Sequence, residues 1–333
     1  MSHWDDMKAF DYDRPTADAD AIRAGRANGA RFIAGGTLLV DLLRLDVERP
    51  ELLVDLNGLA HGELEVSGDS LRIGALVRNS DLAAHPEVIS SFPALSQALL
   101  SGASPQIRNM ATLGGNLLQR TRCSYFRDVA VEACNKRKPG SGCAALNGYS
   151  RMHAVLGVSD QCIALNPSDM CVALLALDAV VHTQGPHGQR ALPIADFHTL
   201  PGRHPEIESL LEAGEIVTHV SLAKTALAKR SVYVKVRDRA SFAFALASAA
   251  VALELEGDRV RQARVALGGV GTKPWRCPEV EQALLGKPAT VETFAAAAAL
   301  GLREAKTTID NQFKVELARR VIARALSLAG TRT

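Results

Sequence analysis

Four of the six cysteines fall within one stretch of irregular sequence, residues 119–162. They are Cys123, Cys134, Cys143 and Cys162, separated by 10, 8 and 18 residues. The stretch has neither a helical nor a strand period, and proline and glycine interrupt it. Irregular segments of this length inside a compact domain are uncommon unless they are functional or tied down. Four thiolates could tie this one to a metal centre, because zinc and iron–sulfur clusters both accept four cysteine ligands.

The charges and the spacing around these cysteines help to choose between the two kinds of centre. Cations outnumber acids there, with Arg120, Arg122, Arg127, Lys136, Arg137, Lys138 and Arg151 against Asp128, Glu132 and Asp160. Cations offset the negative charge of a four-thiolate centre and lower the pKa of nearby thiols. Structural zinc sites usually contain C-x(2–4)-C knuckles, and none is present. The pattern favours an iron–sulfur cluster, while four unrelated buried cysteines are the alternative.

The bulk composition is that of an ordinary globular protein of two or three domains. The chain has 333 residues, of which 47% are hydrophobic and 22% charged, with a net charge of +2. Such a charge gives no electrostatic case for nucleic acid or an anionic membrane. No apolar run reaches the ~18 residues of a spanning helix. The N-terminus shows no signal peptide, and six cysteines in a chain of this length do not indicate a disulfide scaffold.

The first of two glycine pairs, Gly35-Gly36, follows an expected strand at 31–34 and precedes a helix that Thr37 is expected to cap. Glycines let the backbone approach a phosphate, whose oxygens accept from free N–H groups. A plain strand–helix turn is the alternative. No G-x-G-x-x-G sequence is present, which disfavours a dinucleotide-binding Rossmann fold.

The second pair, Gly114-Gly115, lies between Thr112 and Asn116 in an expected turn. Two separate glycine-rich turns with small polar neighbours are stronger evidence for a pyrophosphate-binding site than a single such turn. Simple turn geometry is again the alternative.

A strand at 163–165 and a helix through Leu177 are expected after the cysteine stretch. Pro167 suits the first turn of this helix, and Ser168 or Asp169 can cap it. Asp169 is either that cap or a hydrogen-bond acceptor for a ligand. Cys171 lies on the apolar helix and is expected in the core.

The last third of the sequence predicts an α+β module. Residues 184–206 are expected to form loops and part of a linker, and 225–231 a domain boundary. Strands are expected at 232–236, 249–256 and 261–268, a helix at 242–246, and two or three helices from Pro278 onward. There is no H-E-x-x-H or G-x-S-x-G pattern, so zinc or serine hydrolase chemistry has no support.

The ordered set of these motifs resembles the FAD-binding subunits of the xanthine dehydrogenase, or molybdenum hydroxylase, family. The segments that carry the resemblance are FIAGGTLLVDL, TLGGNLLQ, CIALNPSDMCVAL and YVKVRDRASFAFALASAAVAL. The wording of the cysteine stretch is most similar to the flavin and [4Fe–4S] subunit of the three-subunit periplasmic aldehyde oxidases.

This resemblance implies an α+β fold. An FAD-binding domain of the vanillyl-alcohol-oxidase (PCMH) type would comprise two α+β subdomains, 1–58 and 59–225. The second subdomain would carry the iron–sulfur loop 119–162 as an insert. A C-terminal α+β domain of the CO dehydrogenase flavoprotein type, with an antiparallel sheet and helices, would span 229–330.

The resemblance also implies the site residues. The FAD pyrophosphate would be wrapped by Arg31, Phe32, Ile33, Ala34, Gly35, Gly36, Thr37, Leu38 and Leu39. Further FAD contacts would come from Thr112, Gly115, Asn116, Asp169, Glu215 and Lys235. Cys123, Cys134, Cys143 and Cys162 would ligate a [4Fe–4S] cluster, with Cys171 as the only nearby rival for the fourth ligand.

The implied function is electron transfer, and no residue of this chain need act as a general base. A molybdenum-cofactor large subunit would oxidise an aldehyde to a carboxylic acid, and a [2Fe–2S] small subunit would pass electrons to the FAD of this chain. The FAD would deliver them to an external acceptor. The complex would be a heterotrimer or a dimer of heterotrimers, exported to the periplasm with a signal-bearing partner or, alternatively, cytoplasmic.

Other functions stay open at this point. The chain could serve a complex like 4-hydroxybenzoyl-CoA reductase or xanthine dehydrogenase. A flavin oxidase that takes substrate directly would turn over alone. A zinc-stabilised scaffold without catalysis would be colourless and free of flavin.

Overall fold

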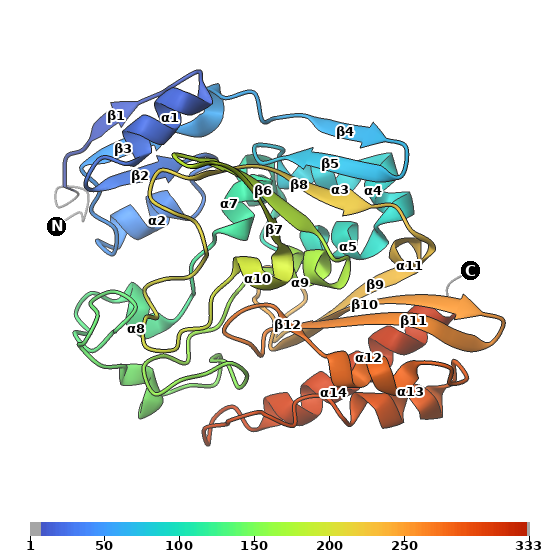
Figure 1. The fold of residues 1–333 in the computed structure, drawn as a ribbon. Helices are drawn as coiled ribbons and strands as arrows, with labels where there is room; N and C mark the ends of the chain where they lie inside the picture. Colours follow the sequence, from blue (N-terminus) through green and yellow to red (C-terminus); the bar gives the residue numbers. More distant parts are fainter. Residues whose placement is uncertain (1–7, 332–333) are drawn as a thin grey trace.

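The computed structural model describes residues 8–331, and three β-sheets follow one another along the chain (Figure 1). Residues 1–7, on which the expected lack of a signal peptide partly rests, lie outside the described residues. Among the described residues, no helix is both long and apolar enough to cross a membrane.

The first sheet is small and parallel, with strand order β1-β3-β2. Its strands are β1 (Asp11–Asp13), β2 (Ala30–Ile33) and β3 (Leu52–Asp55). Helices α1 (Asp18–Gly25) and α2 (Leu39–Arg44) connect them, as parallel neighbours require a crossover. Thr37 does not cap α2, because the helix starts at Leu39, one residue later than a cap at Thr37 requires. Leu38 takes the cap position and provides no side-chain hydrogen bond.

The second sheet has five antiparallel strands in the order β4-β5-β8-β6-β7. They are β4 (Leu64–Ser67), β5 (Ser70–Gly74), β6 (Val180–Gly185), β7 (Gly188–Pro193) and β8 (Ile216–Ala223). The helices between β5 and β6 that precede the cysteine stretch are α3 (Asn79–Ala84), α4 (Pro86–Ser91), α5 (Pro93–Ser101), α6 (Pro105–Met110) and α7 (Leu113–Leu117). The expectation of loops and linker over 184–206 is wrong in its first part, because β6 and β7 form a hairpin that continues into α10 (Ile194–Phe197).

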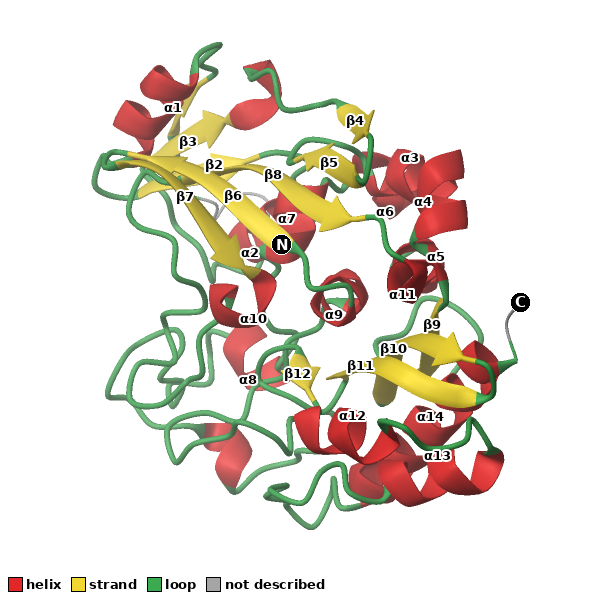
Figure 2. Cartoon of the chain, turned by 45° about the vertical axis from the view of Figure 1, so that its right-hand side comes forward, coloured by secondary structure: helices red, strands yellow, loops and turns green. Residues whose placement is uncertain are grey.

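The third sheet is antiparallel, with order β12-β11-β10-β9, and helices cover one of its faces (Figure 2). After the short helix α11 (Ala226–Lys229) come β9 (Ser231–Val236), β10 (Ala247–Glu256), β11 (Arg259–Gly268) and β12 (Trp275–Arg276). The covering helices are α12 (Pro278–Leu284), α13 (Val291–Ala298) and α14 (Phe313–Gly330). The expected α+β class is confirmed, but the helix expected at 242–246 is wrong. That segment is a loop in which Phe242 has a φ of +52°, which a helix does not allow.

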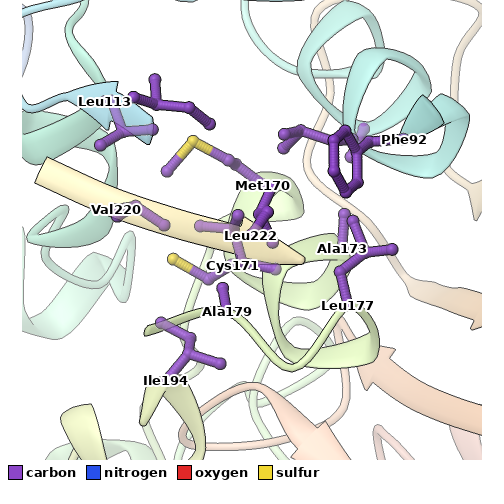
Figure 3. Close-up of a cluster of buried hydrophobic side chains, with 14 of the residues drawn as sticks. Phe92, Leu113, Met170, Cys171, Ala173, Leu177, Ala179, Ile194, Val220 and Leu222 are labelled. Atoms are coloured by element: carbon purple, nitrogen blue, oxygen red, sulfur yellow. The ribbon is translucent and has the colours of Figure 1, made fainter. Parts of the chain in front are cut away.

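Helix α9 (Asp169–Ala176) is the centre of the molecule, and all its residues are buried (Figure 2). It packs between the second sheet and strands β10 and β11 of the third. Figure 3 shows Cys171 of this helix among apolar side chains that include Val220 and Ile194. The expectation that Cys171 belongs to the core is therefore confirmed. Burial raises the pKa of its thiol to about 12.

The segment that joins α7 to α9 is irregular, as expected. It contains only the short helix α8 (Ser124–Arg127) and a 3-10 turn (Ala144–Leu146). The strand expected at 163–165 is wrong, because no partner strand lies beside it. Pro167 precedes α9 and lies outside its first turn, whereas Ser168 caps the helix through a bond from the Cys171 amide.

Candidate cofactor site

The loop between β2 and α2 forms one wall of a long cleft. All residues from Arg31 to Leu39 line its first part, a cavity of about 360 Å³, together with Thr112 and Gly115 of the α7 end. A second cavity of about 620 Å³ shares Thr37, Leu38 and Gly115 with the first. The two cavities therefore adjoin at these residues, and we call them the first and second parts of the cleft.

The backbone geometry of this loop requires glycine at both positions of the pair. A Cβ atom on Gly35 would lie 1.9 Å from the carbonyl oxygen of Met110, and Gly36 has a φ of +70°. Among residues 8–331, the N–H groups of 35–38 donate no hydrogen bond. Unpartnered amides beside open space are the arrangement that binds phosphate oxygens.

The second glycine pair lies in a helix instead of the expected turn. Thr112 caps α7 by accepting from the Gly115 amide at 3.2 Å. Asn116, one residue further along, accepts from the Ser168 hydroxyl at 2.9 Å. The cap of α9 is thus joined to α7, which places the start of α9 at the second part of the cleft.

Asp169 at the start of α9 lies in a buried charged group that lines the second part. Its carboxylate accepts from Lys235 Nζ of β9 at 2.7 Å and from the hydroxyl of Tyr233. Lys235 also donates to the Ser101 carbonyl at 3.0 Å, and its side chain is only 4% exposed. Burial, together with the Asp169 carboxylate, holds the pKa of Tyr233 well above its ordinary value, so Tyr233 stays a donor.

Glu215 borders the first part of the cleft, but its carboxylate accepts hydrogen bonds from other residues of the chain. Arg190 donates to both of its oxygens, and the Thr183 hydroxyl and the Glu212 amide donate as well. Burial alone would raise the pKa of Glu215, but the hydrogen bonds from Arg190 and Thr183 outweigh burial and lower it. Glu215 therefore fixes the β6–β8 edge of the cleft and has no free acceptor directed at a ligand.

An ion-pair network that the sequence did not predict joins the cleft to the cysteine segment. Arg120 donates to Glu48 and to Glu208, and Lys136 reaches the other oxygen of Glu208 at 2.9 Å. Arg31 pairs with Glu48 at 3.0 Å. Arg120 and Lys136 stand out in the sequence as cations near cysteines, but their acidic partners lie 72 or 88 residues away and carry no motif.

The four cysteines of 119–162 come together around one small cavity. Cys123, Cys134, Cys143 and Cys162 all line it, and Cys134 and Cys143 face each other in an isolated antiparallel bridge. Cys171 does not line it. Among residues 8–331, no three His, Cys, Asp or Glu side chains are placed to share a single metal ion. The cavity that the four cysteines line has a volume of only about 10 Å³.

The proximity of the thiols changes their acidity. Burial, with Cys134 and Cys143 nearby, raises the pKa of Cys123 to about 11. A hydrogen bond between Cys143 and Cys162 lowers the pKa of Cys143 to about 6 and raises that of Cys162. Four thiolates this close repel one another unless a cationic centre neutralises them, which is the usual condition of metal-binding cysteines.

Comparison with known proteins identifies the family. The family described as the FAD binding domain in molybdopterin dehydrogenase matches residues 8–224, and the CO dehydrogenase flavoprotein C-terminal domain matches 231–329. The chain is 51% identical, over 97% of its length and 99% of the relative's, to the aldehyde oxidoreductase FAD-binding subunit PaoB of Escherichia coli K12. The chain belongs to the FAD-binding subunits of the molybdenum hydroxylases.

Solved structures show the same fold for this FAD-binding subunit. Carbon monoxide dehydrogenase from Hydrogenophaga pseudoflava matches with a TM-score of 0.75 at 24% identity, covering 96% of both chains. Quinoline 2-oxidoreductase from Pseudomonas putida 86 also matches with a TM-score of 0.75, at 25% identity, over 97% of this chain and 98% of that one. The resemblance stated from the sequence motifs is confirmed.

The cleft of the FAD-binding subunit fits its cofactor. A glycine loop with unpartnered amides suits a pyrophosphate, and the adjoining cavities of about 360 and 620 Å³ have volumes typical of cofactor sites. The residues that would hold FAD are the 31–39 loop, Thr112, Gly115 and Asn116, with Asp169 and Lys235 in the second part. When bound, the flavin accepts and donates electrons. Asp169 and Lys235 would present fixed charges to it, and these individual roles remain predictions.

Proposed function

We propose that this chain is the FAD- and [4Fe–4S]-containing electron-transfer subunit of a molybdenum-dependent aldehyde oxidoreductase. One observation carries the proposal: the four cysteines of 119–162 line a single cavity in a subunit whose FAD cleft lies nearby. The 51% identity to a subunit named for aldehyde oxidoreduction supports the substrate class.

A four-iron cluster suits these cysteines better than zinc does. Tetrahedral zinc draws four sulfurs to one ion, whereas each cysteine of a [4Fe–4S] cluster binds its own iron at a separate corner. Cys123, Cys134, Cys143 and Cys162 are separated by 10, 8 and 18 residues, without the short C-x(2–4)-C knuckles typical of structural zinc sites, and all four line one small cavity. Lys136 lines the same cavity and supplies positive charge beside the thiolates.

A third, small cavity lies between the cysteine cavity and the FAD cleft. This cavity of about 200 Å³ is bordered by Cys162 and Lys136 on the cluster side and by Arg120 and Glu208, which also border the first part of the cleft. The proposed cluster would therefore be separated from the FAD cleft by one small cavity, and it would either exchange electrons with the FAD or stabilise the shape of the cleft. Either role leaves aldehyde oxidation to the molybdenum subunit.

The proposal includes two partner subunits and a compartment. A [2Fe–2S] small subunit would supply electrons, a molybdenum-cofactor large subunit would oxidise the aldehyde, and an external acceptor would remove electrons from the FAD. We place the complex in the periplasm, exported with a signal-bearing partner. Cell fractionation checks the compartment, because a cytoplasmic complex would contradict export, and copurification checks the partners.

Absorption spectroscopy of the purified chain, coexpressed with its partners, tests the cofactors when combined with iron and zinc analysis. We expect flavin bands over a broad iron–sulfur shoulder, with about four irons per FAD. Cys123→Ser should lose iron, whereas the control Cys171→Ser should keep it, because Cys171 lies in the core and not at the cavity.

Two other results would contradict the cofactor assignment. A colourless protein with one zinc would overturn electron transfer and leave a scaffold. Flavin without iron or zinc would keep the family and remove the cluster.

A further inference from the structure

One of the four cysteines, Cys123, contacts a histidine whose role the proposed function does not explain. Nε2 of His153 lies 3.1 Å from Sγ of Cys123, and the residue is only 5% exposed. Tyr125 packs beside the imidazole, with ring centroids 6.1 Å apart. Among residues 8–331, His153 is the only side chain other than a cysteine that makes a hydrogen bond with any of the four sulfurs.

The C-terminal domain holds the loop that carries this ring. The Ser150 amide donates to Asp310 at 2.9 Å, and the Ser150 hydroxyl is 2.6 Å from that of Thr308. The Lys306 amide donates to the Val155 carbonyl at 2.8 Å. Residues on both sides of His153 are therefore hydrogen-bonded to the segment before α14. These bonds, in addition to local packing, hold the imidazole in place.

The direction of the hydrogen bond follows from ligation. A thiolate bound to iron has no proton, so the sulfur can only accept, and the 3.1 Å contact requires an N–H on Nε2. Nδ1 is buried and has no partner among the described residues. The neutral tautomer with its proton on Nε2 makes this bond and leaves Nδ1 as an unpartnered acceptor among the described residues.

We propose that His153 donates an Nε2–H···Sγ hydrogen bond to Cys123 and thereby raises the reduction potential of the cluster, without itself binding iron. The inference rests on the proposed [4Fe–4S] cluster. A hydrogen bond to a ligating sulfur withdraws electron density from the iron and favours the reduced cluster, so the potential rises.

A redox titration of the cluster in the full-length chain, followed by electron paramagnetic resonance, tests the inference. His153→Phe keeps a planar ring but removes the donor. At the midpoint potential of the unaltered protein, we expect its ratio of reduced to oxidised cluster to be about tenfold lower, which is about 59 mV for one electron. His153→Gln restores an N–H and should return the potential most of the way.

His182→Phe is the matched control. His182 lies on β6, contacts Ser221 and His219, and contacts no cysteine. It should leave the cluster potential unchanged. An iron-loaded His153→Phe variant with the potential of the unaltered protein would overturn the inference, and so would an equal shift in His182→Phe.

A measurement on the unaltered sequence covers the case in which His153→Phe loses its iron. With histidine labelled selectively by ¹⁵N, pulsed resonance of the reduced cluster should detect one coupled histidine nitrogen, and His153→Gln should abolish it. Absence of that coupling in an iron-loaded protein overturns the inference. Absence of iron from the unaltered chain overturns the proposed cluster first, and the role of His153 with it, so the two failures are distinguishable.

Discussion

Replacing Asp169 by asparagine removes one charge from the buried pair that joins α9 to β9. The side chain of Lys235 is 4% exposed and that of Asp169 9% exposed, so water screens neither charge effectively. Breaking a buried pair from one side costs about 3–5 kcal/mol, because the remaining charge is left uncompensated. The Ser101 carbonyl still accepts from Lys235 and an amide oxygen can still accept from Tyr233, so we expect the lower end, about 3 kcal/mol.

Asp178→Asn is the matched control for this substitution. Asp178 pairs with Arg264 and Arg276, but its side chain is 50% exposed, and such pairs contribute only about 0–1 kcal/mol. Asp178 has a φ of +51°, which asparagine tolerates, so the control adds no backbone strain.

Urea unfolding of the FAD-free chain measures both free energies. A loss of about 3 kcal/mol lowers the ratio of folded to unfolded protein about a hundredfold. This change is well outside the error of the linear extrapolation. Asp169→Asn combined with Lys235→Met should recover most of the loss, since no unpaired charge remains. An Asp169→Asn variant as stable as Asp178→Asn would refute the reasoning.

Two further predictions concern the glycine loop and a buried lysine. Gly35→Ala should destabilise the chain by about 1–3 kcal/mol and weaken FAD binding at least tenfold, because its Cβ would overlap the Met110 carbonyl. Gly62→Ala, whose Cβ meets nothing within 4 Å, should change neither quantity in unfolding and FAD titrations, and equal effects would contradict the close-approach argument. Burial lowers the pKa of Lys314 to about 7, so between pH 7 and about 10.4 only the unfolded state holds its proton, and stability from this group rises with pH. Lys314→Met should abolish that rise, by at most about 1.4 kcal/mol per pH unit in urea unfolding at several pH values, and identical pH profiles would show the reasoning wrong.

Local patterns predicted the parts of the site that depend on neighbouring residues. Gly35-Gly36, the Ser168 cap and the cysteines of 119–162 are each local signals in the sequence. In the structure the glycine pair lines the cleft, Ser168 caps α9 and the four cysteines line one cavity. The hairpin of β6 and β7 was missed because Gly185 and Gly188, which flank its turn, were interpreted as loop residues.

Pairs distant in the sequence could not be predicted from local patterns. Asp169 meets Lys235 across 66 residues, and Arg120 meets Glu208 across 88. Such pairings follow from how the sheets pack and not from periodicity. The helix expected at 242–246 failed for a related reason, since apolar composition there favoured a helix while the connection between β9 and β10 imposes a positive φ on Phe242.

The hydrogen bonds between the cysteine segment and the chain before α14 have a consequence for biosynthesis. Ser150 and Val155 are held by Asp310, Thr308 and Lys306, which leave the ribosome about 150 residues later. A nascent chain that already exposes all four cysteines therefore lacks the clamp that fixes their loop. If the proposed cluster is bound by these cysteines, we therefore expect its stable insertion only after residues 306–310 have been synthesised, and a chain truncated before residue 306 should bind it less selectively.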